Sequence, residues 1–346
     1  MRPLSAETPT AIDVHTHVVP GHFPSYTGCG CDVAWPSMHD AGPCHRHVVI
    51  SGRVFRTVPD VSWDGGARCT EMDRLRVARH VLSPMPELLS YWLDAADAQV
   101  LLRFVNEQIA SLVASAPQRF FGLAGVPLQD IDCAIAEMRH AVGTLGLSGV
   151  EIAGNVNGRP IGAPRLEPFW DAVQDLGAAV FVHPLRPVAM DRLVGPKPLE
   201  QLLAFPSDTG LALASLITGG VLERHPRLRI AASHGGGTLH ALLPRLQHGW
   251  ATFGELRETM PSAPAELARR LYVDALVYDD AAIGTLIDRF GPGQLMLGSD
   301  FPFSIQDADP VARIERVAPD PELRAALLWR NAERWLDSRC ASTPAT

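Results

Sequence analysis

Lysine is almost absent from this sequence. Of the 30 basic residues, only Lys197 is a lysine and all the others are arginines. Lys197 lies between Pro196 and Pro198, in a stretch typical of a turn. This one residue would have to serve any mechanism that needs a lysine. Such mechanisms are Schiff-base chemistry, a phosphate-binding loop with its lysine, and a carbamylated lysine that bridges two metals. We therefore expect no catalytic lysine.

Long apolar runs, blocks of like charge and closely spaced cysteines are also missing. No apolar run reaches the roughly 18–20 residues of a membrane span, and residues 1–10 lack the layout of a signal peptide. The 38 acidic residues outnumber the basic ones and give a net charge of −8, which argues against nucleic acids and anionic membranes as partners. Six cysteines in 346 residues are too few for a disulfide scaffold, so we expect a protein of the reducing cytoplasm.

Short apolar segments alternate along the chain with amphipathic ones. The apolar segments predict eight strands, at residues 11–17, 79–84, 120–127, 149–153, 178–183, 228–234, 271–277 and 294–300. The amphipathic segments predict helices at residues 97–115, 130–145, 166–176, 211–224, 239–252, 279–290 and 321–336. This alternation indicates an α/β fold with a parallel sheet covered on both faces. Eight such strands predict a closed (β/α)8 TIM barrel, and no Gly-x-Gly-x-x-Gly follows the first strand to favour an open dinucleotide-binding sheet.

We expect residues 1–346 to form one barrel domain with two long connections. The first is an insertion after the first strand, over roughly residues 18–70, and the second covers residues 185–207, after the fifth strand. Both follow the carboxyl ends of strands, the face on which barrel enzymes carry their active sites. Long connections inside a compact domain are usually functional or disordered. A C-terminal helix is expected over roughly residues 321–337.

Polar residues stand at the carboxyl ends of four of the predicted strands. His15 and His17 end the first strand, His183 the fifth, His234 the sixth and Asp300 the eighth. Residues i and i+2 of a strand share a face, so His15 and His17 can both point into the mouth of the barrel. Three imidazoles and one carboxylate that converge there predict a divalent-metal site, and nitrogen-rich ligation favours zinc. His234 would then be a nearby residue that holds or transfers a proton.

The motifs at these strand ends resemble the amidohydrolase superfamily. They are His-x-His at 15–17, His-Pro at 183–184, His-Gly-Gly-Gly at 234–237 and Gly-Ser-Asp-Phe-Pro-Phe at 298–303. Further matches point to the branch that contains 2-amino-3-carboxymuconate-6-semialdehyde decarboxylase. These are Gly-Arg-Val-Phe-Arg at 52–56, Glu-Met-Asp at 71–73, Leu-Ser-Tyr-Trp at 89–92, Arg-x-x-His-Gly at 245–249 and Tyr-Val-Asp-Ala-Leu-Val at 272–277. The resemblance runs from about residue 12 to about residue 336.

The resemblance implies a mononuclear zinc site, with one ion per subunit and manganese, iron or cobalt as alternatives. Its ligands would be His15, His17, His183 and Asp300. His234 would be the acid/base group, so that His234 and Asp300 are the expected catalytic residues. The lack of a lysine at residues 149–153 agrees with a mononuclear site, because binuclear relatives use a carbamylated lysine on the fourth strand.

The resemblance also assigns the substrate-binding residues. Arg56 matches an arginine that binds a substrate carboxylate, and Arg245 matches one that reaches into the active site of a neighbouring subunit, which implies a homodimer. The planar guanidinium group suits carboxylate oxygens. Phe303 and Trp92 are candidates to line the pocket. For either arginine, a solvated or salt-bridged surface position remains the alternative, and for Phe303 ordinary barrel packing does.

The function these residues favour is a zinc-dependent, non-oxidative decarboxylase of a small unsaturated carboxylate. The substrate that the resemblance implies is 2-amino-3-carboxymuconate 6-semialdehyde, converted to 2-aminomuconate 6-semialdehyde and CO₂. One alternative is a decarboxylase of a hydroxybenzoate-type aromatic acid. Others are a metal-dependent hydrolase of a lactone or amide, and a barrel that has lost activity and only binds a partner.

Two features depart from the family pattern. Leu185 stands where relatives commonly have tryptophan after His-Pro, which leaves the exact substrate open. The loop with Cys29, Cys31 and Cys44 carries cysteines that those relatives lack. A second zinc site there is chemically conceivable, but the spacing matches no ligand pattern, and loop residues that partly cover the pocket are the simpler interpretation.

Overall fold

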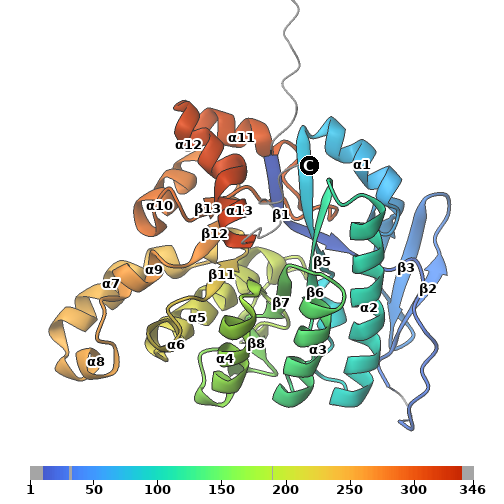
Figure 1. Ribbon diagram of the computed structural model, residues 1–346, viewed down its shortest axis with the longest axis horizontal. Coiled ribbons are helices and arrows are strands. Elements are labelled where there is room, and N and C mark those ends of the chain that lie inside the picture. The colour runs from blue at the N-terminus through green and yellow to red at the C-terminus, as the bar shows by residue number, and fades with distance from the viewer. Residues whose placement is uncertain (1–10, 31–32, 189, 337–346) are drawn as a thin grey trace, which may run out of the picture.

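The computed structural model describes residues 11–30, 33–188 and 190–336, and its centre is an eight-stranded parallel sheet (Figure 1). Its strands, in spatial order, are β1 (Ala11–Val18), β5 (Val77–Pro84), β6 (Phe120–Gly125), β7 (Gly149–Ala153), β10 (Ala179–His183), β11 (Arg229–Ala232), β12 (Tyr272–Asp274) and β13 (Leu295–Met296). Each strand pairs in parallel with the next. All eight lie within or overlap the predicted segments.

The barrel is closed by the chain that follows β13. The eighth strand was expected over residues 294–300, but its regular part is only two residues long. Beyond it, the N–H of Asp300 donates to the carbonyl of His15 (2.9 Å), and the N–H of His17 donates to the carbonyl of Phe301 (2.7 Å). The last segment therefore pairs with β1, and the predicted (β/α)8 barrel is confirmed.

Helices follow the barrel strands and cover the outside of the sheet (Figure 1). They are α2 (Ala95–Ser115), α3 (Ile131–Gly143), α4 (Glu167–Leu176), α5 (Phe205–Thr218), α6 (Val221–Arg224), α7 (Leu239–Thr252), α8 (Gly254–Thr259), α9 (Pro264–Ala268), α10 (Asp280–Phe290) and α11 (Pro310–Val317). α2 begins where the carboxylate of Asp94 accepts a hydrogen bond from the N–H of Ala96 (3.0 Å). It then buries Leu101, Leu102 and Val105 on one face.

A separate apolar cluster fills the barrel itself. It contains residues from the strands, such as Val81, Leu123 and Phe181, together with Trp335 and Leu336 of the C-terminal helix. That helix consists of α12 (Pro321–Ala325), a π-helical turn (Ala326–Arg330) and α13 (Asn331–Leu336). Residue 337, the expected helix end, lies outside the described residues. The end of the barrel opposite the strand carboxyl ends is therefore sealed by side chains.

The insertion after β1 contains strands that the sequence patterns did not predict. β2 (Pro36–Asp40), β3 (His45–Ile50) and β4 (Arg53–Pro59) form an antiparallel sheet, which stands beside the barrel at the right of Figure 1. These strands are half-exposed and rich in polar residues, so they lack the continuous apolar pattern of the barrel strands. A small hairpin, β8 (Asn155–Val156) with β9 (Arg159–Pro160), follows β7.

Helix α1 (Gly65–Arg74) joins the insertion to the barrel through a buried arginine. The guanidinium of Arg68 donates to the carbonyls of Val61 and His17 and to the hydroxyl of Thr16. Burial lowers the pKa of Arg68 to about 9. The insertion is thus fastened to the strand that carries the first two histidines.

The connection after β10 is also more helical than expected. Residues 185–207 contain a 3₁₀ turn (Met190–Arg192) and a π-helical turn (Glu200–Ala204) that runs into α5, so helical structure starts well before residue 211. None of the helices in the described part of the chain is both long and apolar enough to span a membrane.

The close approach of β7 and β10 predicts a strict requirement for glycine at position 149. A Cβ atom there would lie 1.9 Å from the carbonyl oxygen of Ala179, so Gly149→Ala should destabilise the fold by about 3 kcal/mol or more. Gly143, at the end of α3, has open space around its Cα, and Gly143→Ala should be neutral or stabilising by up to ~1 kcal/mol. Denaturant unfolding of both variants measures the difference, and equal stabilities would contradict this account of β7.

Candidate active site

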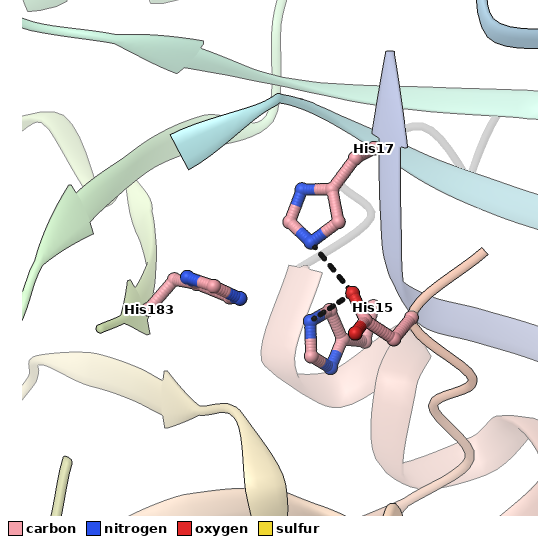
Figure 2. Close-up of side chains that lie close together, drawn as sticks. His15, His17 and His183 are labelled. Atoms are coloured by element: carbon pink, nitrogen blue, oxygen red, sulfur yellow. Dashed lines mark ion pairs between the residues drawn. The ribbon is translucent and has the colours of Figure 1, made fainter. Parts of the chain in front are cut away.

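Three imidazoles and a carboxylate converge at the mouth of the barrel (Figure 2). His15 and His17 come from β1, His183 from the end of β10, and Asp300 from the segment after β13. Each offers one ligand atom, and these four atoms all lie within 4.8 Å of one another. The carboxylate oxygen of Asp300 lies 3.4 Å from Nε2 of His15 and 3.2 Å from Nε2 of His17, the two pairs dashed in Figure 2.

Backbone carbonyls determine the tautomers of two of these histidines. Nδ1 of His17 lies 3.1 Å from the carbonyl oxygen of Pro84, and Nδ1 of His183 lies 2.8 Å from that of Pro184. A carbonyl oxygen only accepts hydrogen bonds, so both Nδ1 atoms must carry the proton. The lone pair of each ring is therefore on Nε2, as a metal ligand requires.

Asp274, at the end of β12, plays the same part for His15 and also supports His234. Its carboxylate accepts a hydrogen bond from Nδ1 of His15 (2.7 Å) and from the backbone N–H groups of His234 (3.0 Å) and Gly235 (2.8 Å). Burial alone would raise the pKa of Asp274, but the hydrogen bond from His15 holds it below its ordinary value. Sequence reasoning gave Asp274 no role, because the predicted strand at residues 271–277 placed it in the middle of a strand, whereas the observed β12 ends at Asp274.

The surroundings of the site shift the pKa values of His15 and His234 in opposite directions. Burial alone would lower the pKa of His15, but the hydrogen bond to Asp274 and the charge of Asp300 raise it to about 9. Burial, followed by the charge of His15, lowers the pKa of His234 to about 4. The ring of His234 is therefore neutral near pH 7.

The unpartnered atoms of this cluster fit a divalent metal. Nε2 of His15, Nε2 of His17 and Oδ1 of Asp300 are buried and have no hydrogen-bond partner. Polar atoms are seldom left so in a protein interior, and three that face one point indicate an ion. The donor set is three imidazoles, one of them hydrogen-bonded to the carboxylate of Asp274, and the carboxylate of Asp300. This set is suited to zinc and similar metals.

A cavity of about 310 Å³ opens from this cluster. His183 and Asp300 line it, so the cluster has an open side. His234 lies on the same wall, with its ring 5.2 Å from that of His15 and 5.3 Å from that of His183. Its Nδ1 lies 3.0 Å from the hydroxyl of Ser233. The structure thus places His234, the expected acid/base residue, next to the cluster but not among its four potential metal ligands.

Arg56 and Phe303 also line the cavity and lie against each other. The guanidinium carbon of Arg56 lies 4.1 Å above the centre of the Phe303 ring, and that ring stacks on His17 at 5.0 Å with an angle of 18°. A cation over an aromatic ring is favourable, and no described residue accepts a hydrogen bond from the guanidinium of Arg56. Arg56 is therefore presented to whatever occupies the cavity.

Trp92 and Arg245 lie outside this cavity. Trp92 borders a separate cavity with Tyr26 and Asp97, and the guanidinium carbon of Arg186 lies 3.3 Å from its ring centre. Arg245 is exposed on α7, which with α8 projects from the barrel at the left of Figure 1.

Leu185 and the cysteines of the insertion are not part of the cluster either. Leu185 is buried and does not border the cavity. Cys29 and Cys44 are exposed free thiols, and Cys31 lies outside the described residues. Among residues 11–30, 33–188 and 190–336, the four-residue cluster is the only group of three or more potential metal ligands. The described residues therefore offer no second zinc site.

Several residues of the cavity were missed by sequence reasoning. Glu87, Gln201, His240 and Tyr278 line it, and they come from connections after four different strands. Glu151 of β7 is buried beneath it, 3.7 Å from Nδ1 of His17, and burial raises the pKa of its carboxyl to about 8. The four cavity residues lie outside the predicted strand ends, so only the packing of the connections reveals them.

Comparison with known proteins gives a consistent result. A family model described as amidohydrolase matches residues 12–337. The 2-amino-3-carboxymuconate-6-semialdehyde decarboxylase of Dictyostelium discoideum is 35% identical over 328 residues, which cover 94% of this chain and 91% of that protein.

Solved structures agree with the observed fold. The 5-carboxyvanillate decarboxylase of Sphingomonas paucimobilis matches with a TM-score of 0.72 and 29% identity, over 79% of this chain and 83% of that one. The apo form of the IDCase of Metarhizium anisopliae matches with a TM-score of 0.79 and 22% identity, over 95% and 97% of the two chains, and supports the fold alone.

The contacts of Asp274 predict that it controls metal affinity without being a ligand. Asp274→Asn removes the ionised acceptor of His15 and should weaken zinc binding about 10- to 100-fold, as chelator competition would measure. Asp279→Asn is a matched control, because Asp279 caps α10 through the N–H of Ala282 and asparagine caps equally well. Unchanged zinc affinity in Asp274→Asn would show that His15 does not need this hydrogen bond.

Proposed function

The chain belongs to the amidohydrolase family, and from this we infer that it is a metal-dependent, non-oxidative decarboxylase of a small unsaturated carboxylate. One observation carries the proposal: Arg56, a cation whose guanidinium donates to no described residue, shares a cavity with Asp300 and His234. A carboxylate bound to Arg56 would lie beside the metal cluster. The names of the curated relative and of the 29% identical structure, both decarboxylases, support the same reaction.

We propose His15, His17, His183 and Asp300 as the ligands of one zinc ion per subunit, with manganese, iron or cobalt as alternatives. A divalent metal at this position supplies Lewis acidity and lowers the pKa of a bound water. The hydrogen bonds to Nδ1 of the three histidines orient their rings in advance, so the chain itself fixes the geometry of the site.

The other residues of the cavity would bind the substrate and move a proton. Arg56 would hold a carboxylate of the substrate, and Phe303 would pack against its conjugated part. In the net reaction, the carbon–carboxylate bond breaks, CO₂ leaves, and a proton takes its place on carbon. His234, held beside the cluster through its backbone by Asp274, is proposed to position and transfer that proton.

We propose 2-amino-3-carboxymuconate 6-semialdehyde as the substrate, with 2-aminomuconate 6-semialdehyde and CO₂ as products. The 35% identical Dictyostelium relative supports this choice. A hydroxybenzoate-type acid is the second candidate, which the likeness to 5-carboxyvanillate decarboxylase favours. Hydrolysis of a lactone or amide, and a purely binding role, have no comparable support among these relatives.

We further propose a homodimer in which Arg245 acts on the cavity of the partner subunit. Arg245 is exposed and lies on a helix that projects from the barrel (Figure 1). Leu242 on the same helix and Phe253 just after it are exposed apolar side chains, which suit an interface. The free thiols of the four described cysteines agree with a cytoplasmic location, which stays a prediction.

Release of CO₂ by the zinc-loaded protein tests the proposed activity. With 2-amino-3-carboxymuconate 6-semialdehyde, loss of its chromophore with formation of CO₂ is expected, and a panel of hydroxybenzoates tests the second candidate. His234→Ala should lower kcat at least about 100-fold while zinc stays near one per chain. Ring opening or amide cleavage without CO₂ would refute decarboxylation, and loss of zinc in His234→Ala would show that His234 is a ligand.

Mixed dimers test the position of Arg245. Arg56→Ala and Arg245→Ala subunits should each be inactive alone. If Arg245 serves the partner's cavity, a mixed dimer contains one cavity with both arginines, so random mixing should restore about a quarter of wild-type activity. No recovery in dimers confirmed by dual-tag purification would place Arg245 in its own subunit's site, and full activity of Arg245→Ala alone would place it outside catalysis.

A further inference from the structure

Glu87 lines the catalytic cavity and has no assigned role. It lies in the 3₁₀ turn Pro86–Leu89, directly after β5, at the same end of the barrel as the metal cluster. Its backbone carbonyl accepts hydrogen bonds from Ser90, but among the described residues no other residue forms a hydrogen bond or ion pair with its carboxylate. A partly buried carboxylate therefore faces the cavity, and among the described residues only its own backbone N–H acts on it as a hydrogen-bond donor.

Two arginines whose charge acts on Glu87 lie against aromatic rings. Arg56 lies on the ring of Phe303 at 4.1 Å, and Arg186 lies on the ring of Trp92 at 3.3 Å. Both arginines act on Glu87 through their charge, yet neither forms an ion pair within 4.0 Å. Arg56 and Glu87 thus line the same cavity without an ion pair between them, and both can contact a ligand.

Burying part of a carboxylate costs free energy, which the backbone N–H of Glu87 offsets only in part. Burial raises the pKa of Glu87 above its ordinary value, and the charge of Arg56 opposes this change. A ligand that brings its own donor would remove the penalty. A second carboxylate placed at the same point would be repelled.

We propose that Glu87 is a specificity-determining residue, which accepts a hydrogen bond from an N–H or O–H group that the substrate carries beside the carboxylate held by Arg56. This inference rests on the proposed decarboxylase function, because it uses the same cavity and the same carboxylate site. It assigns the substrate to the amino- or hydroxy-substituted unsaturated acids. A substrate with no donor at that position would leave Glu87 unpartnered.

Equilibrium binding of a matched ligand pair tests the role of Glu87. The probes are 2-aminobenzoate and benzoate, which differ only in the donor group, titrated calorimetrically into the zinc-loaded protein. Wild type should bind 2-aminobenzoate about 10- to 100-fold more tightly than benzoate. Glu87→Gln should lose at least about fivefold of this ratio, while its affinity for benzoate stays equal or increases.

Glu200→Gln is the matched control. Glu200 acts on Glu87 by charge but does not line the cavity, so this variant should keep the wild-type ratio. Zinc content and thermal melting verify that both variants are folded. The ratio of the two affinities cancels effects that both ligands share, such as a contact with the metal.

The proposal is overturned if Glu87→Gln keeps the wild-type ratio, if Glu200→Gln reduces it equally, or if wild type does not prefer 2-aminobenzoate. Binding does not require turnover, so these outcomes are independent of CO₂ release. If the protein releases no CO₂ from any candidate substrate but shows the expected affinity ratios, the proposed function is refuted. Glu87 would then still recognise a hydrogen-bond donor on the ligand. If the protein releases CO₂ but does not show these ratios, the decarboxylase function is supported and the proposed role of Glu87 is refuted.

Discussion

The pairing of β1 with the segment after β13 is the contact on which the site depends. Three backbone hydrogen bonds close the barrel, from Val14 to Leu297, from His17 to Phe301 and from Asp300 to His15. The same register sets the carboxylate of Asp300 3.2 Å from Nε2 of His17, although the two residues are at opposite ends of the sequence. Asp13 strengthens this seam by accepting hydrogen bonds from Ser299. The contact that closes the barrel therefore also places Asp300 beside the two histidines of β1.

Asp274 links the four-residue cluster to His234, the proposed acid/base residue. One carboxylate holds the ring of His15 and the backbone of His234, so these two residues cannot shift independently. His234 has a φ of 55°, a left-handed conformation that is strained for a residue with a side chain, and its hydrogen bond to Asp274 helps to maintain it. The proposed proton transfer would thus keep a fixed position relative to the metal.

The cavity combines a positive and a negative group that do not neutralise each other. A salt bridge between Arg56 and Glu87 would satisfy both groups and leave little for a ligand. Here Arg56 lies over the ring of Phe303, and no described residue forms an ion pair with Glu87. The pocket is therefore prepared for a ligand that carries an anion and a hydrogen-bond donor. The protein as a whole, with a net charge of −8, gives no sign of this local arrangement.

The sequence by itself determined the barrel, the four-residue cluster and the neighbouring His234. Strand alternation is a local property, and parallel strands place their carboxyl ends on one face, so His15, His183 and Asp300 could be brought together without coordinates. Only the tertiary structure revealed four other features. These are the pairing of β1 with the segment after β13, the contacts of Asp274, the position of Trp92 outside the cavity, and the absence of an ion pair between Glu87 and the described residues. Each depends on how connections far apart in the chain pack against one another, and no local pattern of residue types encodes that geometry.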